Sequence, residues 1–559
     1  MRLGTLVRVY TSVRVVSAFL VCLCLGCQSG KPAESVLLLD QPTVAQTTGL
    51  KQEFFPAKKH ASNPVLRQSA AWEGVGPYVW GTRLMQDATS KQLRLWYTAY
   101  SFQGNAYRMG LATSTDGLRW TKPELNLAKF GDSPGGNWLP VGSHADKGVL
   151  SIARDPRPET PPDRRFLGIR FTYDGEFISF SPDGIRWKEY SGNPIWHVPS
   201  DIIHVMWDDR RNRFVAYYKV WEVKGIEVRP DGSEQPMVAW MPSFDQKKNS
   251  TNTIELSGPR IFFSTNGPAK VERCRLVLRA NQQGRDDGGG SSLSGDWTGK
   301  RVQAWAESED GIHWSNEQVV LRADEKDPPT ANIQYMFVMQ YGGYYLGFLT
   351  LHDERGLFSI ELAWSEDGLH WTRSRQPWLE HGPKDAFDSG MVLGPTDPVL
   401  SGREMIFPYG GFPITHDSPR QDWQAAIGLA TMRLDGFAAW RADKSGVLVT
   451  QPFVCDGDEL FVNADEVTGT IRAEVLDTKG KVVKGFEESK CYPIRAGEHA
   501  TDTLQPGECG WITWRKGKLS SLRGQRIQLR FLIDRAQVYS FRIATPQTHH
   551  LAAPRATTR

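Results

Sequence analysis

A seven-residue motif that recurs along the chain constrains the fold more than any other feature. The pattern Ser-x-Asp-Gly-x-x-Trp occupies residues 114–120, 181–187, 308–314 and 365–371, and an altered fifth copy lies at 432–440. An aspartate can accept hydrogen bonds from the backbone that follows it, and a glycine tolerates a positive φ, so Asp-Gly predicts a hairpin turn. We expect each tryptophan to pack back onto the sheet that the turn connects.

The spacing of these turns predicts five repeated β units. The intervals between successive turn aspartates are 67, 127, 57 and 68 residues. Repeats of this period are typical of a β-propeller, in which each blade is a four-stranded sheet. The long interval contains a polar, glycine-rich stretch at about 224–300, either a decorated loop or an unmarked sixth blade, and its poor hydrophobic patterning favours the loop. The turn aspartates are Asp116, Asp183, Asp310, Asp367 and Asp435.

A different pattern begins after residue 440. Short β-like runs separated by turn signals occupy about 441–545, without a helical period, which predicts an antiparallel β-sandwich. The predicted fold class is therefore all-β: a five-bladed β-propeller over 28–440, with an insertion at about 224–300, followed by a C-terminal β-sandwich over 441–545. Residues 546–559 are predicted to be a flexible tail.

The first 27 residues resemble an export signal. Three arginines within the first fourteen residues precede an apolar run at 15–26, which is shorter than the ~20 residues needed to span a bilayer. The run ends Leu-Cys-Leu-Gly-Cys, similar to a bacterial lipobox in which Cys27 is acylated, although Cys24 stands where an aliphatic residue is usual. We expect an exported lipoprotein, anchored through Cys27 at the periplasmic or outer-membrane face of the cell envelope. A plain signal peptide cut nearby is the alternative.

Charge and cysteine content narrow the partners and cofactors. The chain has 66 basic and 63 acidic residues, a formal net charge of +3, so we expect no nucleic-acid partner. Four cysteines remain beyond Cys27, and none has CxxC spacing, so we expect no metal site and no cofactor. Any disulfide pairing among them, and the oligomeric state, stay open. These cysteines are Cys274, Cys455, Cys491 and Cys509.

Acidic residues ahead of the repeated turns are the candidates for chemistry. The innermost strands of a propeller converge on its axis, so carboxylates near the starts of those strands would share one cavity. Most candidates stand about forty residues before a turn; Asp201 instead opens a strand ahead of the insertion, and Asp155 follows its strand. The candidates are Glu73, Asp146, Asp155, Asp201, Asp327 and Asp388.

Cleavage of a glycosidic bond matches such a set of carboxyl groups. One acid must protonate the leaving oxygen, and one carboxylate must act as nucleophile or base. We predict Asp201 and Asp388 for these two roles, in an order that the sequence leaves open, with Glu73 and Asp155 lining the same funnel. Four further residues are predicted to bind substrate: Asp327, Tyr335, Tyr409 and His416.

The chain resembles the bacterial five-bladed propeller hydrolases of the invertase- and arabinanase-like type, and among them an envelope group common in planctomycetes. In the invertase-like relatives an Arg-Asp-Pro motif carries the transition-state stabiliser, which implies that role for Asp155 within Arg154-Asp155-Pro156. Their nucleophile motif and their Glu-Cys-Pro acid motif are absent here, which argues against sucrose or fructan chemistry. Besides the repeated turns, the resemblance runs through residues 63–66, 95–97, 327–329, 387–390, 434–437, 462–464 and 538–541.

Two functions of different classes follow from these features. The first is a glycoside hydrolase that acts on a poly- or oligosaccharide through axial carboxylates. The second is a non-catalytic glycan-binding propeller of the cell envelope, with a structural envelope protein as a third possibility. The sugar, the linkage and the retaining or inverting outcome stay open.

Overall fold

The computed structural model is all-β, and its described residues form strands with five short 3-10 helices among them. Within the described part of the chain, no helix has the length and apolar character needed to cross a membrane. The structure describes residues 35–40, 42–87, 89–101, 106–141, 150–172, 175–196, 200–228, 231–241, 245–248, 253–262, 270–279, 299–465, 467–495 and 510–545.

The four intact copies of the repeated motif form the same turn. In the first copy the Gly117 amide donates to Ser114 Oγ at 2.9 Å, and Asp116 Oδ1 accepts from the two amides that follow Gly117. The Trp120 indole donates to Gly117 O at 3.0 Å. The other copies repeat these bonds, and the four glycines have φ between 73° and 76°. The Asp-Gly pairs therefore close equivalent hairpins, as the motif predicts.

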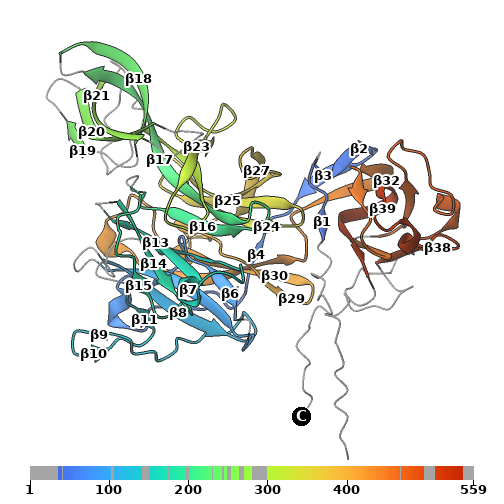
Figure 1. Cartoon of the computed structure of the whole chain (residues 1–559), viewed down its shortest axis with the longest axis horizontal. Helices are drawn as coiled ribbons and strands as arrows, with labels where there is room; N and C mark the ends of the chain where they lie inside the picture. Colours follow the sequence, from blue (N-terminus) through green and yellow to red (C-terminus); the bar gives the residue numbers. More distant parts are fainter. Residues whose placement is uncertain are drawn as a thin grey trace, which may run out of the picture.

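The described strands ahead of and around these turns lie in four sheets (Figure 1), and we number five antiparallel units within them because the nine-stranded sheet contains two. Unit 1 contains β5 (Pro77–Tyr78), β6 (Leu84–Gln86), β7 (Leu93–Ser101), β8 (Ala106–Ser114) and β11 (Trp138–Leu139). Unit 2 contains β12 (Leu150–Arg154), β13 (Phe166–Thr172), β14 (Gly175–Ser181) and β15 (Lys188–Glu189). Unit 3 contains β16 (Ile203–Asp208), β17 (Arg213–Val228), β22 (Gly299–Ser308) and β23 (Ser315–Leu321).

Units 4 and 5 belong to one nine-stranded sheet, joined by a parallel pairing of Phe358 with Met391. Unit 4 contains β24 (Asn332–Tyr341), β25 (Tyr344–His352), β26 (Phe358–Ser365) and β27 (Thr372–Leu379). Unit 5 contains β28 (Met391–Leu393), β29 (Val399–Ser401), β30 (Glu404–Phe412) and β31 (Ala426–Arg433), with β4 (Lys58–Lys59) as its outermost strand.

Contacts between the innermost segments bring the units together at their inner edges. The Val205 amide of β16 donates to Ser151 Oγ of β12 at 2.9 Å. Arg83, between β5 and β6, forms a bidentate ion pair with Asp397 of unit 5. It also donates to the carbonyl oxygen of Val205. Unit 1 is thus bonded directly to units 3 and 5, and unit 2 to unit 3.

The C-terminal sheet forms a separate lobe, at the right of Figure 1. Its long strand β39 (Arg526–Ala544) pairs with β32 (Ala438–Thr450), β34 (Glu459–Asp465) and β35 (Thr470–Leu476). These strands enclose an apolar core of their own, which includes Leu448, Val462, Ile471 and Phe531.

Three early strands belong to this C-terminal sheet, outside the region in which the sequence predicts them. β1 (Val36–Leu37) pairs with β39, while β2 (Val44–Thr48) and β3 (Lys51–Phe54) pair with β32. The chain then enters unit 5 as β4. These strands are short, and their partners lie some four to five hundred residues along the chain, so no local pattern marks the pairing.

The stretch predicted as a decorated loop contains strands. β18 (Glu234–Met241) and β21 (Lys270–Arg279) pair with the far end of β17, and β20 (Thr253–Phe262) pairs with both β18 and β21. Because β17 belongs to unit 3, this extension lengthens that unit's sheet and projects away from the units, at the upper left of Figure 1.

Candidate functional site

Seven ionisable side chains gather at the end of the units that lies opposite the repeated turns. They come from the starts of β14 and β22, the segment before β16, the continuation of β17, the end of β25 and the loop between β30 and β31. Each unit from 2 to 5 contributes at least one of them. They are Glu176, Asp201, Lys219, Arg301, His352, His416 and Asp417.

Asp201 is one of two accessible carboxylates in this cluster, the other being Asp417. Its side chain is 52% exposed, and its Oδ1 lies 2.5 Å from Nζ of the buried Lys219. Desolvation by the surrounding protein opposes ionisation, but the charges of Lys219, Arg301 and His416 outweigh it and hold the pKa of Asp201 below its usual range. Asp201 is therefore an ionised carboxylate that solvent can reach.

Glu176 has the opposite character. Ser200, the neighbour of Asp201, donates its amide to Glu176 Oε1 at 2.8 Å, whereas the buried Oε2 has no hydrogen-bond partner among the described residues. Burial raises the pKa of Glu176 well above its usual range, and the negative charge of Asp201 raises it further. The site thus holds one carboxyl group with a raised pKa and two, Asp201 and Asp417, with a lowered pKa; an acid/base pair requires carboxyl groups split in this way.

Arg301 is a buried cation within the cluster. It is buried at 4% exposure, its guanidinium lies 4.3 Å from the Trp221 ring centre, and its Nη1 lies 3.2 Å from Nδ1 of His352. Burial and the nearby Arg301 charge lower the pKa of His352 to about 3, so this imidazole is neutral. A neutral ring beside an arginine accepts the N–H through its single lone pair, which leaves the ring hydrogen on Nε2.

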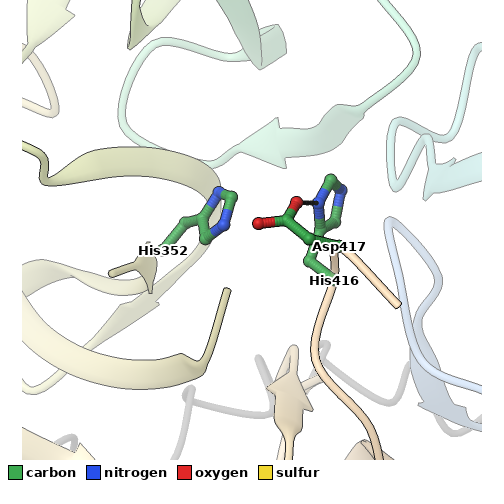
Figure 2. Close-up of side chains that lie close together, drawn as sticks. All are labelled: His352, His416 and Asp417. Carbon is green, nitrogen blue, oxygen red and sulfur yellow. Dashed lines mark hydrogen bonds and ion pairs between the residues drawn. The ribbon is translucent and has the colours of Figure 1, made fainter. Parts of the chain in front are cut away.

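Figure 2 shows the Asp417 carboxylate between the imidazoles of His352 and His416. Potential ligand atoms of these three residues lie within 4.8 Å of one another, close enough to hold a metal ion. The donor set does not suit one, however, because the lone pair of His352 is engaged by Arg301 and the permanent charge of that guanidinium would repel a cation. His416 lies 3.1 Å from Asp417 through its Nδ1.

The comparisons with known proteins give only weak structural similarities. No family model and no curated protein matches the chain. The chain is similar to BT0996 in a complex with RGII, at 12% identity and a TM-score of 0.42, over 68% of this chain and 92% of that one. It is also similar to a glycoside hydrolase, at 11% identity and a TM-score of 0.40, over 68% and 92% of the two chains.

A third similar structure is the α-L-arabinofuranosidase PaAbf62A from Podospora anserina in complex with cellotriose. The identity is 9% and the TM-score 0.35, over 68% of this chain and 97% of that one. Structures similar to this chain thus include glycoside hydrolases. Similarity at this level assigns no activity, so the function has to be argued from the side chains of the site.

Of the residues predicted from sequence, the structure brings Asp201 and His416 into this cluster. The positive charge of His416, when present, would act on Asp201, and both residues interact with Arg301. The other predicted acids lie elsewhere. Cys27 and Asp146 lie outside the described residues.

Three of the predicted acids pair with a cation on the outer side of their own unit. Glu73 lies 2.6 Å from Lys122 and also accepts from the Tyr97 hydroxyl and two backbone amides. Asp388 lies 2.5 Å from Lys59 of β4 and accepts from the Tyr409 hydroxyl at 2.6 Å.

The third such acid, Asp327, pairs with Arg373 of β27, which also binds Glu361. Each of these acids precedes an innermost strand, as the sequence predicts, but its carboxylate points back toward the outermost strand. The chain crosses from the outside of one unit to the inside of the next at these positions. These ion pairs therefore hold the connections between neighbouring units in place. The Tyr409 hydroxyl donates to Asp388 in one of these pairs, so Tyr409 has a structural role and does not face a substrate.

Asp155 lies at the opposite end of the units from Asp201. Its carboxylate is held by Arg157, which also donates to Glu309 O in the third repeated turn. Asp201 instead neighbours Arg301, near the start of β22. Arg301 and Glu309 stand eight residues apart on and just after β22, about 26 Å at ~3.3 Å per residue, so the acids near these two residues do not share a site. Tyr335 is buried beside His204, among the innermost strands.

Glu176, Lys219, Arg301, His352 and Asp417 are the site residues that sequence reasoning missed. A signal for two of them exists in the repeat. Glu176 stands seven residues before Asp183, and Arg301 nine residues before Asp310, where the third strand of a unit begins. Charged residues at the start of that strand are therefore a better guide to this site than acids forty residues before the turn.

Proposed function

We propose that this protein is a glycoside hydrolase in which Glu176 is the general acid and Asp201 the nucleophile or general base. The observation that carries the proposal is the split between the two carboxyl groups. Glu176 is buried, its pKa is raised, and it accepts from the amide of Ser200, the neighbour of Asp201; Asp201 is accessible and its pKa is lowered. Glycosidic cleavage uses one carboxyl group in each of these states.

Each group has a defined task in this mechanism. Glu176 transfers its proton to the glycosidic oxygen as the bond to the anomeric carbon breaks. Asp201 either bonds to that carbon directly or removes a proton from the water that attacks it. Lys219, at 2.5 Å from Asp201, keeps that carboxylate ionised and positioned until the substrate arrives.

We also propose the finer architecture and the location that the sequence predicts. The five units would be blades around one axis, and the C-terminal sheet would fold into a sandwich. The ties among Arg83, Asp397, Val205 and Ser151 support a common centre for the units. The N-terminal lipobox-like motif supports export and lipid anchoring through Cys27.

A panel of poly- and oligosaccharides tests the catalytic proposal. On a substrate that the wild-type protein cleaves, Glu176→Gln and Asp201→Asn should each lower kcat by about 10²- to 10⁴-fold. Asp388→Asn is the matched control, because it makes the same change at an acid paired with Lys59 outside the cluster. Its folded fraction should keep its turnover. Full activity in both site variants would refute the assignment.

A non-catalytic glycan-binding protein is the second candidate. The ion pair of Asp201 with Lys219 favours it, since an engaged carboxylate is less free to attack a sugar. Saturable binding of a glycan with no cleavage of any member of the panel would support this candidate over hydrolysis.

A further inference from the structure

Arg301 is a buried cation for which the described part of the chain supplies no carboxylate partner. Buried arginines are rarely found without a carboxylate, because a desolvated charge is costly unless it is paired. Arg373 and Arg170 follow this rule, through Glu361 and Glu189 respectively. Arg301 has no carboxylate within 4.0 Å among the described residues, and its buried Nε has no hydrogen-bond partner there.

The immediate neighbours of Arg301 do not replace such a partner. The Trp221 ring offers its face, and His352 offers one neutral acceptor. Desolvation lowers the pKa of Arg301 to about 10, although Asp201 and Asp417 act in the opposite direction from a distance. Lys219 lies over the same Trp221 ring, 5.6 Å from its centre, and adds a second positive charge.

Solvent reaches Asp201, whose charge and that of the buried Arg301 act on each other. Asp201, which pairs with Lys219, is 52% exposed, so a sugar that contacts Asp201 would carry its neighbouring substituents close to Arg301. A guanidinium binds carboxylate and sulfate oxygens through charge-assisted hydrogen bonds, which are about twice as strong as neutral ones.

We propose that Arg301, supported by Lys219, binds an anionic oxygen group carried by the substrate, so that the protein acts on uronic-acid or sulfated glycans. This inference rests on the proposed glycosidase function for the identity of the ligand as a sugar. A metal ion at His352, His416 and Asp417 is the competing occupant of the cluster, and the engaged lone pair of His352 argues against it.

Binding of monosaccharides tests the inference without requiring catalysis. Calorimetric titration with glucuronate and galacturonate should show binding to the wild-type protein, and glucose and galactose should bind at least tenfold more weakly. Arg301→Gln should weaken uronate binding by about 10- to 100-fold and leave the neutral sugars unaffected. Arg119→Gln is the control, because its side chain is 90% exposed. Equal affinity of wild-type protein for charged and neutral sugars would overturn the proposal.

A second variant and titrations with other ligands exclude the remaining explanations. Arg301→Lys retains the buried charge if Arg301→Gln fails to fold, and it should still lose most of the uronate affinity because lysine lacks the planar fork. Inorganic phosphate and sulfate are titrated alone, and binding tighter than that of any uronate would indicate a site for a free anion. Zn²⁺ is titrated as well, and binding that is lost in His416→Ala would indicate a metal site. Either result overturns the proposal.

The outcomes for this inference and for the proposed function can be distinguished. Uronate binding that depends on Arg301, without cleavage of any glycan, would refute hydrolysis and leave the anion site standing. Cleavage of neutral glycans that Glu176→Gln abolishes, without preference for charged sugars, would refute the anion site alone.

Discussion

The protonated state of Glu176 predicts a pH dependence of stability that needs no knowledge of the substrate. Above the unfolded-state pKa of about 4.3, the unfolded chain releases this proton while the folded protein retains it. The folded state therefore loses about 1.4 kcal/mol of stability per pH unit through this group until the raised folded-state pKa is reached. Below about pH 4 both states are protonated and the effect is absent.

Glu176→Gln removes this dependence, because the amide is neutral at every pH. Relative to the wild-type protein, the unfolding free energy of the variant should rise with pH above pH 5, with a slope of at most about 1.4 kcal/mol per pH unit. Urea titrations followed by tryptophan fluorescence at pH 5, 6 and 7 measure the difference. The amide is also nearly isosteric, so the hydrogen bond from Ser200 to Oε1 can persist.

The control for this experiment is Glu366→Gln, which makes the same chemical change at an exposed position. Its curve should run parallel to that of the wild-type protein. If Glu176→Gln also ran parallel, Glu176 would be ionised in the folded protein, and the reasoning that makes it the general acid would fail.

Two other predictions concern the repeat and the N-terminus. Trp314 is 5% exposed, and its ring centre lies 5.2 Å from that of Trp196, so Trp314→Ala should cost ~3–5 kcal/mol of stability. Trp371 is the half-buried equivalent in another copy of the motif, and Trp371→Ala should cost less. Equal losses of stability in thermal melts would contradict this ordering. Cys27→Ser should abolish incorporation of labelled fatty acid and release the protein from the membrane fraction. Membrane retention without labelling would mean another anchor.

The repeated turns were predictable because their information is local. Seven consecutive residues contain the hydrogen-bond acceptors, the glycine and the packing tryptophan, and four copies reinforce one another. The pairing of β3 with β32 was not predictable, since each strand is short and its partner is distant. The described strands of the 224–300 stretch were mistaken for a loop because they show little hydrophobic alternation.

The candidate site was predicted only in part for a related reason. Asp201 and His416 could be chosen by residue type and by position relative to a strand. The direction in which a carboxylate points depends on its partner, however, and Glu73 and Asp388 point toward lysines on outer strands. Likewise, no sequence pattern distinguishes the paired Arg373 from the unpaired Arg301, because only the folded state decides which carboxylates come within reach.

The pairing of β1, β2 and β3 with β32 and β39 orders the events of biosynthesis. Residues 36–54 leave the ribosome early, but their partners at 438–450 and 526–544 are made last. Until then the early strands have exposed edges, which are prone to aggregation. The β4 strand likewise waits for β31 before unit 5 is complete. Unit 5 can therefore close once β31 is made, whereas the C-terminal lobe cannot be completed until β39, at 526–544, has been synthesised.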